Sequence, residues 1–307
     1  MKVVRIEDLE LKHVPGPTTP REGQMHYHPF MTGKPGEPDN FTLVVYYTDP
    51  DYVTPRHRHN FDQIRVQIEG DEYDYSRNGK MRLGDVGYFP EGTYYGPAKS
   101  GEKVATLLLQ IGGMSGQGYM SQPEYRAAVD ELKKRGEFGG GIFTWFDDKG
   151  QKHNQDGYEA VWEHCRQQRL EYPPERFQAP VFMSPDSFDW FPYEGATGVD
   201  HKFLGSFGEG GGMRLGLFRM AAGATIASAP QRMIFFVMDG AGRANDQPWK
   251  KQSAIHVERG ESCTLTAQEP STLFYIGIPD HALIPKARRE KSAKRPPKLV
   301  AEAAPAH

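Results

Sequence analysis

Residues 55–97 read PRHRHNFDQIRVQIEGDEYDYSRNGKMRLGDVGYFPEGTYYGP, and this stretch decides the fold. Its first half places His57 and His59 two residues apart. On a strand this spacing puts both imidazoles on one face, because side chains alternate between the two faces. Gln63 follows four residues later, and Gly70 ends this half after the alternating segment IRVQIE.

The second half of the stretch runs from Gly84 through a tight turn at Pro90 and Gly92 to Tyr95. Together the two halves resemble the signature motifs of the cupin superfamily, G-x5-H-x-H-x3/4-E-x6-G and G-x5-P-x-G-x2-H. The residues in register with these motifs are His57, His59, Gly70, Gly84, Pro90 and Gly92.

Three positions depart from the two motifs. Gln63 stands where the family usually has Glu, Tyr95 stands where it usually has His, and Asp51 replaces the leading Gly. The resemblance implies an all-β fold of cupin barrels (double-stranded β-helix or jelly-roll), with the two motifs facing each other. His57, His59, Gln63 and Tyr95 should then converge inside the barrel.

A second series of short β-segments begins near residue 199 and predicts another barrel, because the strands recur at short and regular intervals. Counting from Gly240 and Gly260 gives the positions at which this barrel would carry metal ligands. They are occupied by Ala227, Ala229, Met233 and Ser271. None of these side chains binds a hard or borderline metal well. We therefore predict a bicupin with a degenerate second barrel and the site in the first.

The domain organisation follows from composition and helix signals. Ser121, with Glu124 three residues later, predicts a capped helix, and GYEAVWEHCRQQR predicts a second amphipathic helix. We predict an N-terminal arm at 1–40, a first barrel at 41–120, a short helical connector at 121–180, a second barrel at 181–285 and a basic, disordered tail at 286–307. His26 and His28 in the arm lack a third ligand of suitable spacing and favour an arm strand over a metal pair.

Composition and charge exclude several classes of protein. The 307 residues carry a net charge of −3, with the tail from Lys286 at +5 and the rest at −8. An acidic body argues against nucleic-acid binding. The absence of any 18-residue apolar run argues against a membrane helix. Cys165 and Cys263, without CxxC spacing, are expected to be reduced thiols in a cytoplasmic protein.

The converging residues predict a metal site. Two imidazoles with oxygen donors from Gln63 and Tyr95 suit a divalent metal ion. We expect Fe(II), and spacing alone leaves Mn, Ni or Zn open. The alternative for Gln63 and Tyr95 is that they hydrogen-bond each other across a site without metal. Arg65 shares the face of Gln63 and is expected either to bind a substrate carboxylate or to pair with an acidic side chain at the rim.

Three functions compete for this site. The resemblance to bicupin dioxygenases implies a metal-dependent oxidoreductase of dioxygenase type that acts on a small organic or aromatic acid. The second is a metal-dependent isomerase or lyase, with Tyr95 or Tyr94 as general acid/base. The third is a non-catalytic, small-molecule-binding cupin. Tyr95 and Arg65 are the expected catalytic residues, and a homodimer is the expected assembly.

Overall fold

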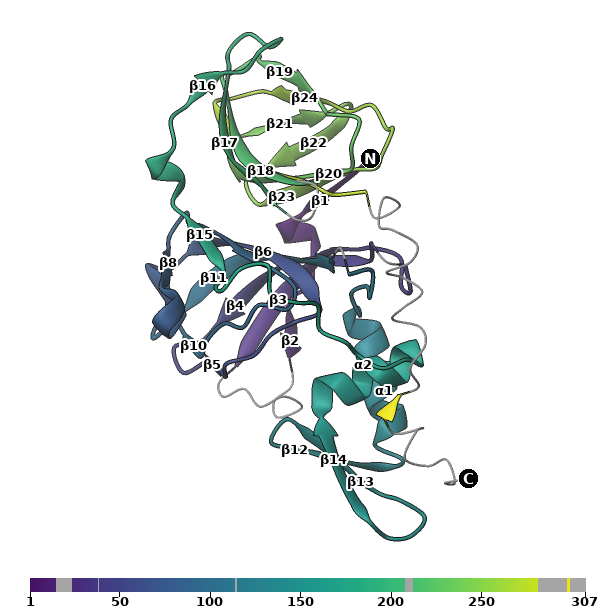
Figure 1. Ribbon diagram of the computed structural model, residues 1–307. Helices are drawn as coiled ribbons and strands as arrows, with labels where there is room; N and C mark the ends of the chain where they lie inside the picture. The colour runs from purple at the N-terminus through teal and green to yellow at the C-terminus, as the bar shows by residue number, and fades with distance from the viewer. Residues whose placement is uncertain (15–23, 38, 114, 208–211, 281–296, 299–307) are drawn as a thin grey trace.

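The structure is a computed structural model, and it describes residues 1–14, 24–37, 39–113, 115–207, 212–280 and 297–298. The regular structure of the described residues is mainly antiparallel β-sheet, arranged as two barrels with a smaller unit that carries α1 and α2 (Figure 1). The predicted fold class, two jelly-roll barrels with a short helical connector, is confirmed. The predicted disordered tail lies outside the described residues, apart from 297–298.

The first barrel is built from two sheets. Its strands are β2 (Lys12–Val14), β3 (Met25–Thr32), β4 (Phe41–Thr48), β5 (Val53–Thr54), β6 (Phe61–Glu69), β7 (Glu72–Asp74), β8 (Lys80–Arg82), β9 (Val86–Phe89), β10 (Ala98–Lys99), β11 (Val104–Gly112) and β15 (Val181–Met183). The larger sheet has the order β15-β9-β6-β11-β4-β3-β2, and the smaller has the order β5-β10-β7-β8. The segment with His26 and His28 is β3, which pairs with β4 and extends the larger sheet.

The second barrel repeats this arrangement. Its strands are β1 (Lys2–Arg5), β16 (Phe191–Pro192), β17 (Val199–Phe207), β18 (Met213–Met220), β19 (Thr225–Ala227), β20 (Met233–Asp239), β21 (Ala241–Ala244), β22 (Gln247–Lys250), β23 (Ser253–Val257), β24 (Thr264–Ala267) and β25 (Ser271–Gly277). The larger sheet has the order β1-β23-β20-β25-β18-β17-β16, and the smaller has the order β19-β24-β21-β22. Short 3-10 turns occur at η1 (Ile6–Asp8), η2 (Ser76–Asn78) and η3 (Pro185–Ser187).

The two barrels exchange their edge strands. β1 precedes the first barrel in sequence but pairs with β23 of the second. β15 precedes the second barrel but pairs with β9 of the first. Strand pairing therefore differs from the predicted boundaries at two places. The start of the predicted arm 1–40 joins the second barrel, and the start of the predicted barrel 181–285 joins the first.

The connector contains α1 (Gln122–Leu132), α2 (Gly157–Arg166) and a sheet of β12 (Gly136–Gly139), β13 (Ile142–Phe146) and β14 (Lys152–Asp156). The predicted capping box of Ser121 and Glu124 is present at the start of α1. Glu124 also accepts a hydrogen bond from Arg166 at 2.7 Å, which joins α1 to the end of α2. The Asp156 carboxylate accepts from the backbone N–H of Glu159 and caps α2.

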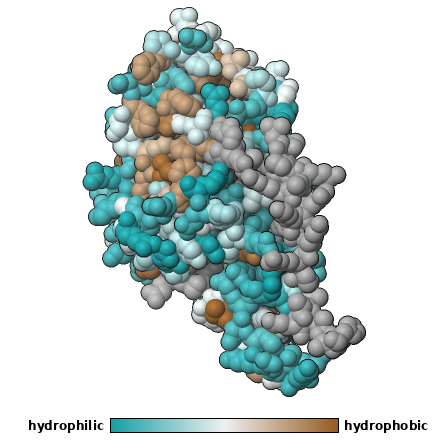
Figure 2. All heavy atoms as spheres, in the orientation of Figure 1, coloured by the Kyte–Doolittle hydropathy of each residue, from teal (hydrophilic) through white to brown (hydrophobic). Residues whose placement is uncertain are grey.

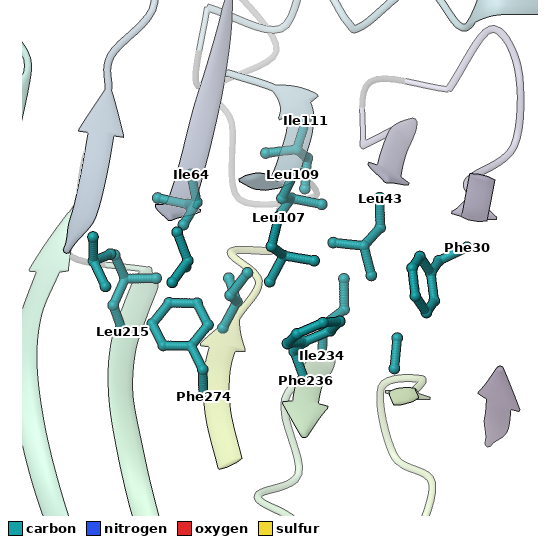
Figure 3. Close-up of a cluster of buried hydrophobic side chains, with 14 of the residues drawn as sticks. Phe30, Leu43, Ile64, Leu107, Leu109, Ile111, Leu215, Ile234, Phe236 and Phe274 are labelled. Carbon is teal, nitrogen blue, oxygen red and sulfur yellow. The ribbon is translucent and has the colours of Figure 1, made fainter. Parts of the chain in front are cut away.

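The larger sheets of the two barrels share one hydrophobic core (Figure 3). Ile64 on β6 and Leu107 on β11 belong to the same buried cluster as Leu215 on β18 and Phe274 on β25. Alternation along β6 then turns Gln63 and Arg65 away from this core. In an isolated barrel the apolar face of the sheet would point inward, whereas here the apolar face of β6 packs against the other barrel.

The interior of the second barrel is apolar as well. A separate buried cluster contains Phe235 and Val237 of β20, Trp249 of β22 and Leu273 of β25. β20 therefore has apolar side chains on both faces, since Ile234 and Phe236 lie in the core shared by the barrels.

Some large apolar side chains of the second barrel are exposed. On the face drawn in Figure 2, apolar side chains gather over the second barrel and its junction with the first, while the connector is mostly hydrophilic. Phe191 on β16 and Phe203 on β17 are 65% and 43% exposed. The homodimer remains a prediction.

No helix in the described part of the chain is long and apolar enough to cross a membrane.

We predict that Leu107→Ala lowers the free energy of unfolding by about 2–5 kcal/mol, because it opens a cavity in the core between the barrels. Leu83→Ala is the matched control, since Leu83 is 59% exposed while Leu107 is 1% exposed. The control should cost about 0.5 kcal/mol or less. Urea denaturation of both variants measures the difference, and equal losses would contradict the shared core.

Candidate functional site

The two halves of the quoted stretch hydrogen-bond to each other at the end of the first barrel. The backbone N–H groups of His57 and Tyr95 each donate to the other residue's carbonyl, at 3.0 and 2.9 Å. The N–H of Gly92 donates to the carbonyl of His59 at 2.7 Å. His57 forms an isolated bridge here, whereas the spacing predicted a regular strand. The expectation that the two motifs face each other agrees with this pairing.

The predicted imidazoles and Tyr95 lie together. The ring centroids of His57 and His59 are 4.8 Å apart in an edge-on arrangement, and those of His57 and Tyr95 are 4.4 Å apart. Nδ1 of His57 lies 2.7 Å from the carbonyl oxygen of Pro55. Because a carbonyl only accepts, this contact assigns a proton to Nδ1, and in the neutral ring Nε2 is then the acceptor nitrogen.

Arg65 occupies the space between the predicted oxygen donors. Its Nε and Nη2 donate to Oε1 of Gln63 at 3.0 and 2.7 Å. Nη2 also donates to the hydroxyl of Tyr95 at 3.0 Å, and Nη1 donates to the hydroxyl of Tyr75 at 2.8 Å. The guanidinium lies 4.3 Å from the ring centroid of Phe89. It is therefore held by neutral oxygens and an aromatic face.

This arrangement departs from two of the alternatives drawn from the sequence. One alternative was a direct hydrogen bond between Gln63 and Tyr95. Instead, the guanidinium of Arg65 bridges the two side chains. Within the described residues Arg65 has no ion pair with an acidic side chain, so pairing with Asp or Glu at the rim is wrong. Burial lowers the pKa of Arg65, but the neighbouring tyrosines Tyr75, Tyr95 and Tyr46 outweigh this effect and raise the pKa above its ordinary value.

The predicted metal donors do not fit a metal ion in this arrangement. Oε1 of Gln63 and the hydroxyl of Tyr95 already accept hydrogen bonds from a cation. A divalent ion on the same oxygens would lie beside the guanidinium, and the two positive charges would repel each other. The described residues contain no group of three His, Cys, Asp or Glu side chains able to hold a metal. Two imidazoles alone are a weak donor set.

A cavity of about 460 Å³ opens in front of these residues, between the first barrel and the connector. His57, His59, Gln63 and Arg65 line it, whereas Tyr95 lies behind Arg65 and does not. Among the described residues, its lining includes nine tyrosines: Tyr27, Tyr46, Tyr52, Tyr73, Tyr94, Tyr119, Tyr125, Tyr158 and Tyr172. The connector therefore supplies part of the wall of the cavity.

Burial keeps several tyrosines of this cavity neutral, because it raises the pKa of Tyr73, Tyr119, Tyr158 and Tyr172. Burial raises the pKa of Tyr119 to about 12, and it raises the pKa of Tyr158 well above its ordinary value. Burial also raises the pKa of Tyr75, which accepts from Arg65. Neutral phenols donate as well as accept hydrogen bonds, so the cavity offers polar donors on aromatic walls.

Two further arginines line the cavity. The guanidinium of Arg56 lies 4.3 Å from the ring centroid of Tyr94, and that of Arg58 lies 4.0 Å from the ring centroid of Tyr172. Both stack on aromatic faces in the way that guanidinium groups favour. Arg56 is exposed and Arg58 is half-buried, so positive charge extends from Arg65 toward solvent.

Sequence reasoning missed several of these residues. Arg56 and Arg58 alternate with the two histidines in PRHRH, and this basic pattern was visible in the sequence. Tyr75 lies in DEYDYS, where no spacing rule connects it to Arg65. Tyr158 and Tyr172 belong to the connector, and only the folded chain places them over the barrel.

A second buried polar cluster lies apart from the cavity. Glu91 is 3% exposed, and its Oε1 accepts from the backbone N–H of Ser115 at 2.9 Å. Asp62 accepts from the hydroxyl of Tyr88 and from the backbone N–H of Glu91. Burial, and then the neighbouring carboxylate of Asp62, raise the pKa of Glu91 to about 7.

Comparisons with known proteins support the fold and no more. No family model matches this chain, and no curated protein matches it. A structure from Nostoc punctiforme described as a "putative dioxygenase" matches with a TM-score of 0.60 and 9% identity, covering 92% of this chain and 84% of the other. A variant of the Bacillus subtilis oxalate decarboxylase matches with a TM-score of 0.53 and 13% identity, covering 93% and 81%. At such identities the likeness shows a shared two-barrel fold.

We predict that Glu91→Gln removes a pH dependence of stability. Because the pKa of Glu91 in the folded protein is raised above its ordinary 4.5 to about 7, folding favours the protonated carboxyl. Its contribution is fully present below about pH 4.5 and is lost as the pH rises through 7. Glu91→Gln should therefore be more stable than the unmodified chain at pH 8, by up to about 3 kcal/mol.

Urea denaturation at pH 5 and pH 8 measures this effect. Glu10→Gln is the control, because Glu10 is exposed. An unchanged difference between the two pH values in Glu91→Gln would show that another group causes it.

Proposed function

We propose that the first barrel binds a small, planar aromatic molecule in the cavity between the barrel and the connector. The single observation behind this proposal is the cavity itself, with a volume of about 460 Å³ and a lining rich in tyrosine. This volume lies within the range of small-molecule sites, and the combination of aromatic walls with a few polar groups is typical of them. Aromatic rings also pack on one another in offset or edge-on geometries that suit a flat ligand.

The apolar interior of the second barrel supports the assignment of the binding site to the first barrel. The interior of the second barrel is filled by apolar side chains such as Phe235, Trp249 and Leu273. The positions predicted for ligands carry Ala227, Ala229, Met233 and Ser271. A degenerate second barrel then acts as the support against which the first barrel packs.

Binding without turnover is the function that the donor geometry favours. The oxygens of Gln63 and Tyr95 accept hydrogen bonds from Arg65, so they are not placed to bind a metal ion as well. His57 and His59 line the same cavity and would contact the bound molecule through their ring edges and nitrogens. The predicted role of Tyr95 becomes one of positioning, since its hydroxyl holds Arg65 from behind.

A metal-dependent oxidoreductase of dioxygenase type is the second candidate. One observation favours it: the carbonyl of Pro55 fixes Nδ1 of His57 and leaves Nε2 as the acceptor. Metal-binding histidines are usually oriented by such a contact from the other ring nitrogen. This candidate, like the isomerase or lyase alternative, requires Arg65 to leave Gln63 and Tyr95, after which Fe(II), Mn, Ni or Zn could bind.

We predict saturable one-to-one binding of 2-naphthamide, a neutral planar probe, to the full chain in isothermal titration calorimetry. Leu108→Trp should weaken it at least about tenfold, a loss of about 1.4 kcal/mol, because Leu108 lines the cavity and the indole would fill it. Leu83→Trp is the control, since Leu83 lies on the surface. Equal binding by both variants would place the probe outside the cavity.

Metal content separates the two candidates. We predict that protein purified without added metal holds only substoichiometric iron, manganese, nickel and zinc by elemental analysis. His57→Ala/His59→Ala should not change this content. Stoichiometric metal in the unmodified chain that is lost in the double variant would favour the oxidoreductase and contradict a metal-free site.

A further inference from the structure

Arg65 is a charged, partly buried group that has no opposite charge beside it among the described residues. It lines the cavity, and every hydrogen bond it makes among the described residues goes to a neutral oxygen of Gln63, Tyr75 or Tyr95. A guanidinium cannot lose its proton in a protein. Removing such a charge from water is costly unless a counter-charge offsets the loss. The structure therefore keeps an uncompensated cation at the wall of its cavity.

Hydrogen-bond donors remain beside this cation. A guanidinium has five N–H groups, and those of Arg65 make four hydrogen bonds, which leaves one on Nη1. Because Oε1 of Gln63 faces a group that only donates, its Nε2 must point the other way. Gln63 is 1% exposed, and this Nε2 has no hydrogen-bond partner within the described residues. The remaining N–H of Arg65 and the amide Nε2 of Gln63 can therefore both donate a hydrogen bond to a bound acceptor.

The carboxylates that line the cavity do not supply it. Asp156 caps α2 by accepting from the backbone N–H of Glu159. Glu159 accepts from Nζ of Lys298 at 2.8 Å. Both belong to the connector side of the cavity and have partners there, and neither is paired with Arg65.

We propose that Arg65 takes the position of the metal ion as the fixed cation of this barrel, and that it anchors the carboxylate of an aromatic acid. This proposal rests on the proposed function, because it names the chemical class of the same ligand. A carboxylate only accepts hydrogen bonds and matches a guanidinium in shape. The carboxylate would offset the partly buried charge of Arg65, while the ring of the acid packs on the tyrosines of the cavity.

Arg56 and Arg58 fit the same ligand. They carry positive charge on the walls of the cavity and stack on Tyr94 and Tyr172. Positive charge at the entrance of a cleft raises the local concentration of anions and speeds their association. Arg56 and Arg58 thus add positive charge to the cavity that Arg65 lines, and aromatic rings hold both of them in place.

The test compares 2-naphthoate with 2-naphthamide, which differ in charge but hardly in shape, by calorimetry on the full chain at pH 7.5. We expect 2-naphthoate to bind about tenfold to hundredfold more tightly, as hydrogen bonds to charged groups allow. Arg65→Met should remove this preference, and Arg65→Lys should keep part of it. Arg77→Met is the control, because Arg77 is exposed and does not line the cavity.

The outcomes separate the two proposals. Equal affinities for 2-naphthoate and 2-naphthamide in the unmodified chain would overturn the carboxylate anchor and leave the aromatic site intact, with no variant needed. Binding of neither probe would overturn both proposals. After dialysis against a chelator, unchanged binding of 2-naphthoate is expected. A requirement for added metal would show that Arg65 is not the anchoring cation.

Discussion

The packing of the two seven-stranded sheets against each other is the constraint on which the rest of the structure depends. It uses the apolar face of β6, with Ile64 and Val66, as an interface between the barrels. Since side chains alternate along a strand, Gln63 and Arg65 must then face the interior of the first barrel. These polar side chains lie beside a small apolar cluster that includes Tyr75, Phe89 and Tyr95, while the shared core between the barrels buries the apolar face of β6.

A polar interior must still satisfy its own hydrogen bonds. Arg65 is held at its neutral oxygen acceptors by four hydrogen bonds and packs on Phe89. A methyl or an aliphatic group at position 65 would leave the oxygens of Gln63, Tyr75 and Tyr95 without this donor, which is costly for buried groups. The four residues therefore form one unit, and the geometry of the cavity follows from the position of the guanidinium.

The sequence predicted what depends on local pattern and spacing. The strands of both barrels, the capped helix at Ser121 and the meeting of His57 with Tyr95 all follow from short motifs. The exchange of β1 and β15 between the barrels could not be predicted, because edge-strand pairing depends on where the chain crosses between distant elements. The bridge from Arg65 to Gln63 and Tyr95 was missed for a related reason. Spacing places three side chains on one face but does not say which of them occupies the centre.

The two barrels show how little must change for one fold to serve as support or as site. β6 and β20 hold the same place in the larger sheets of their barrels. β6 lies between β9 and β11, and β20 lies between β23 and β25. Both present apolar side chains to the shared core. Inward, β20 carries Phe235 and Val237 in a filled interior, whereas β6 carries Gln63 and Arg65 beside a cavity. Because the outer faces fix the packing, the inner faces are free to differ, and the two barrels differ there in both charge and cavity.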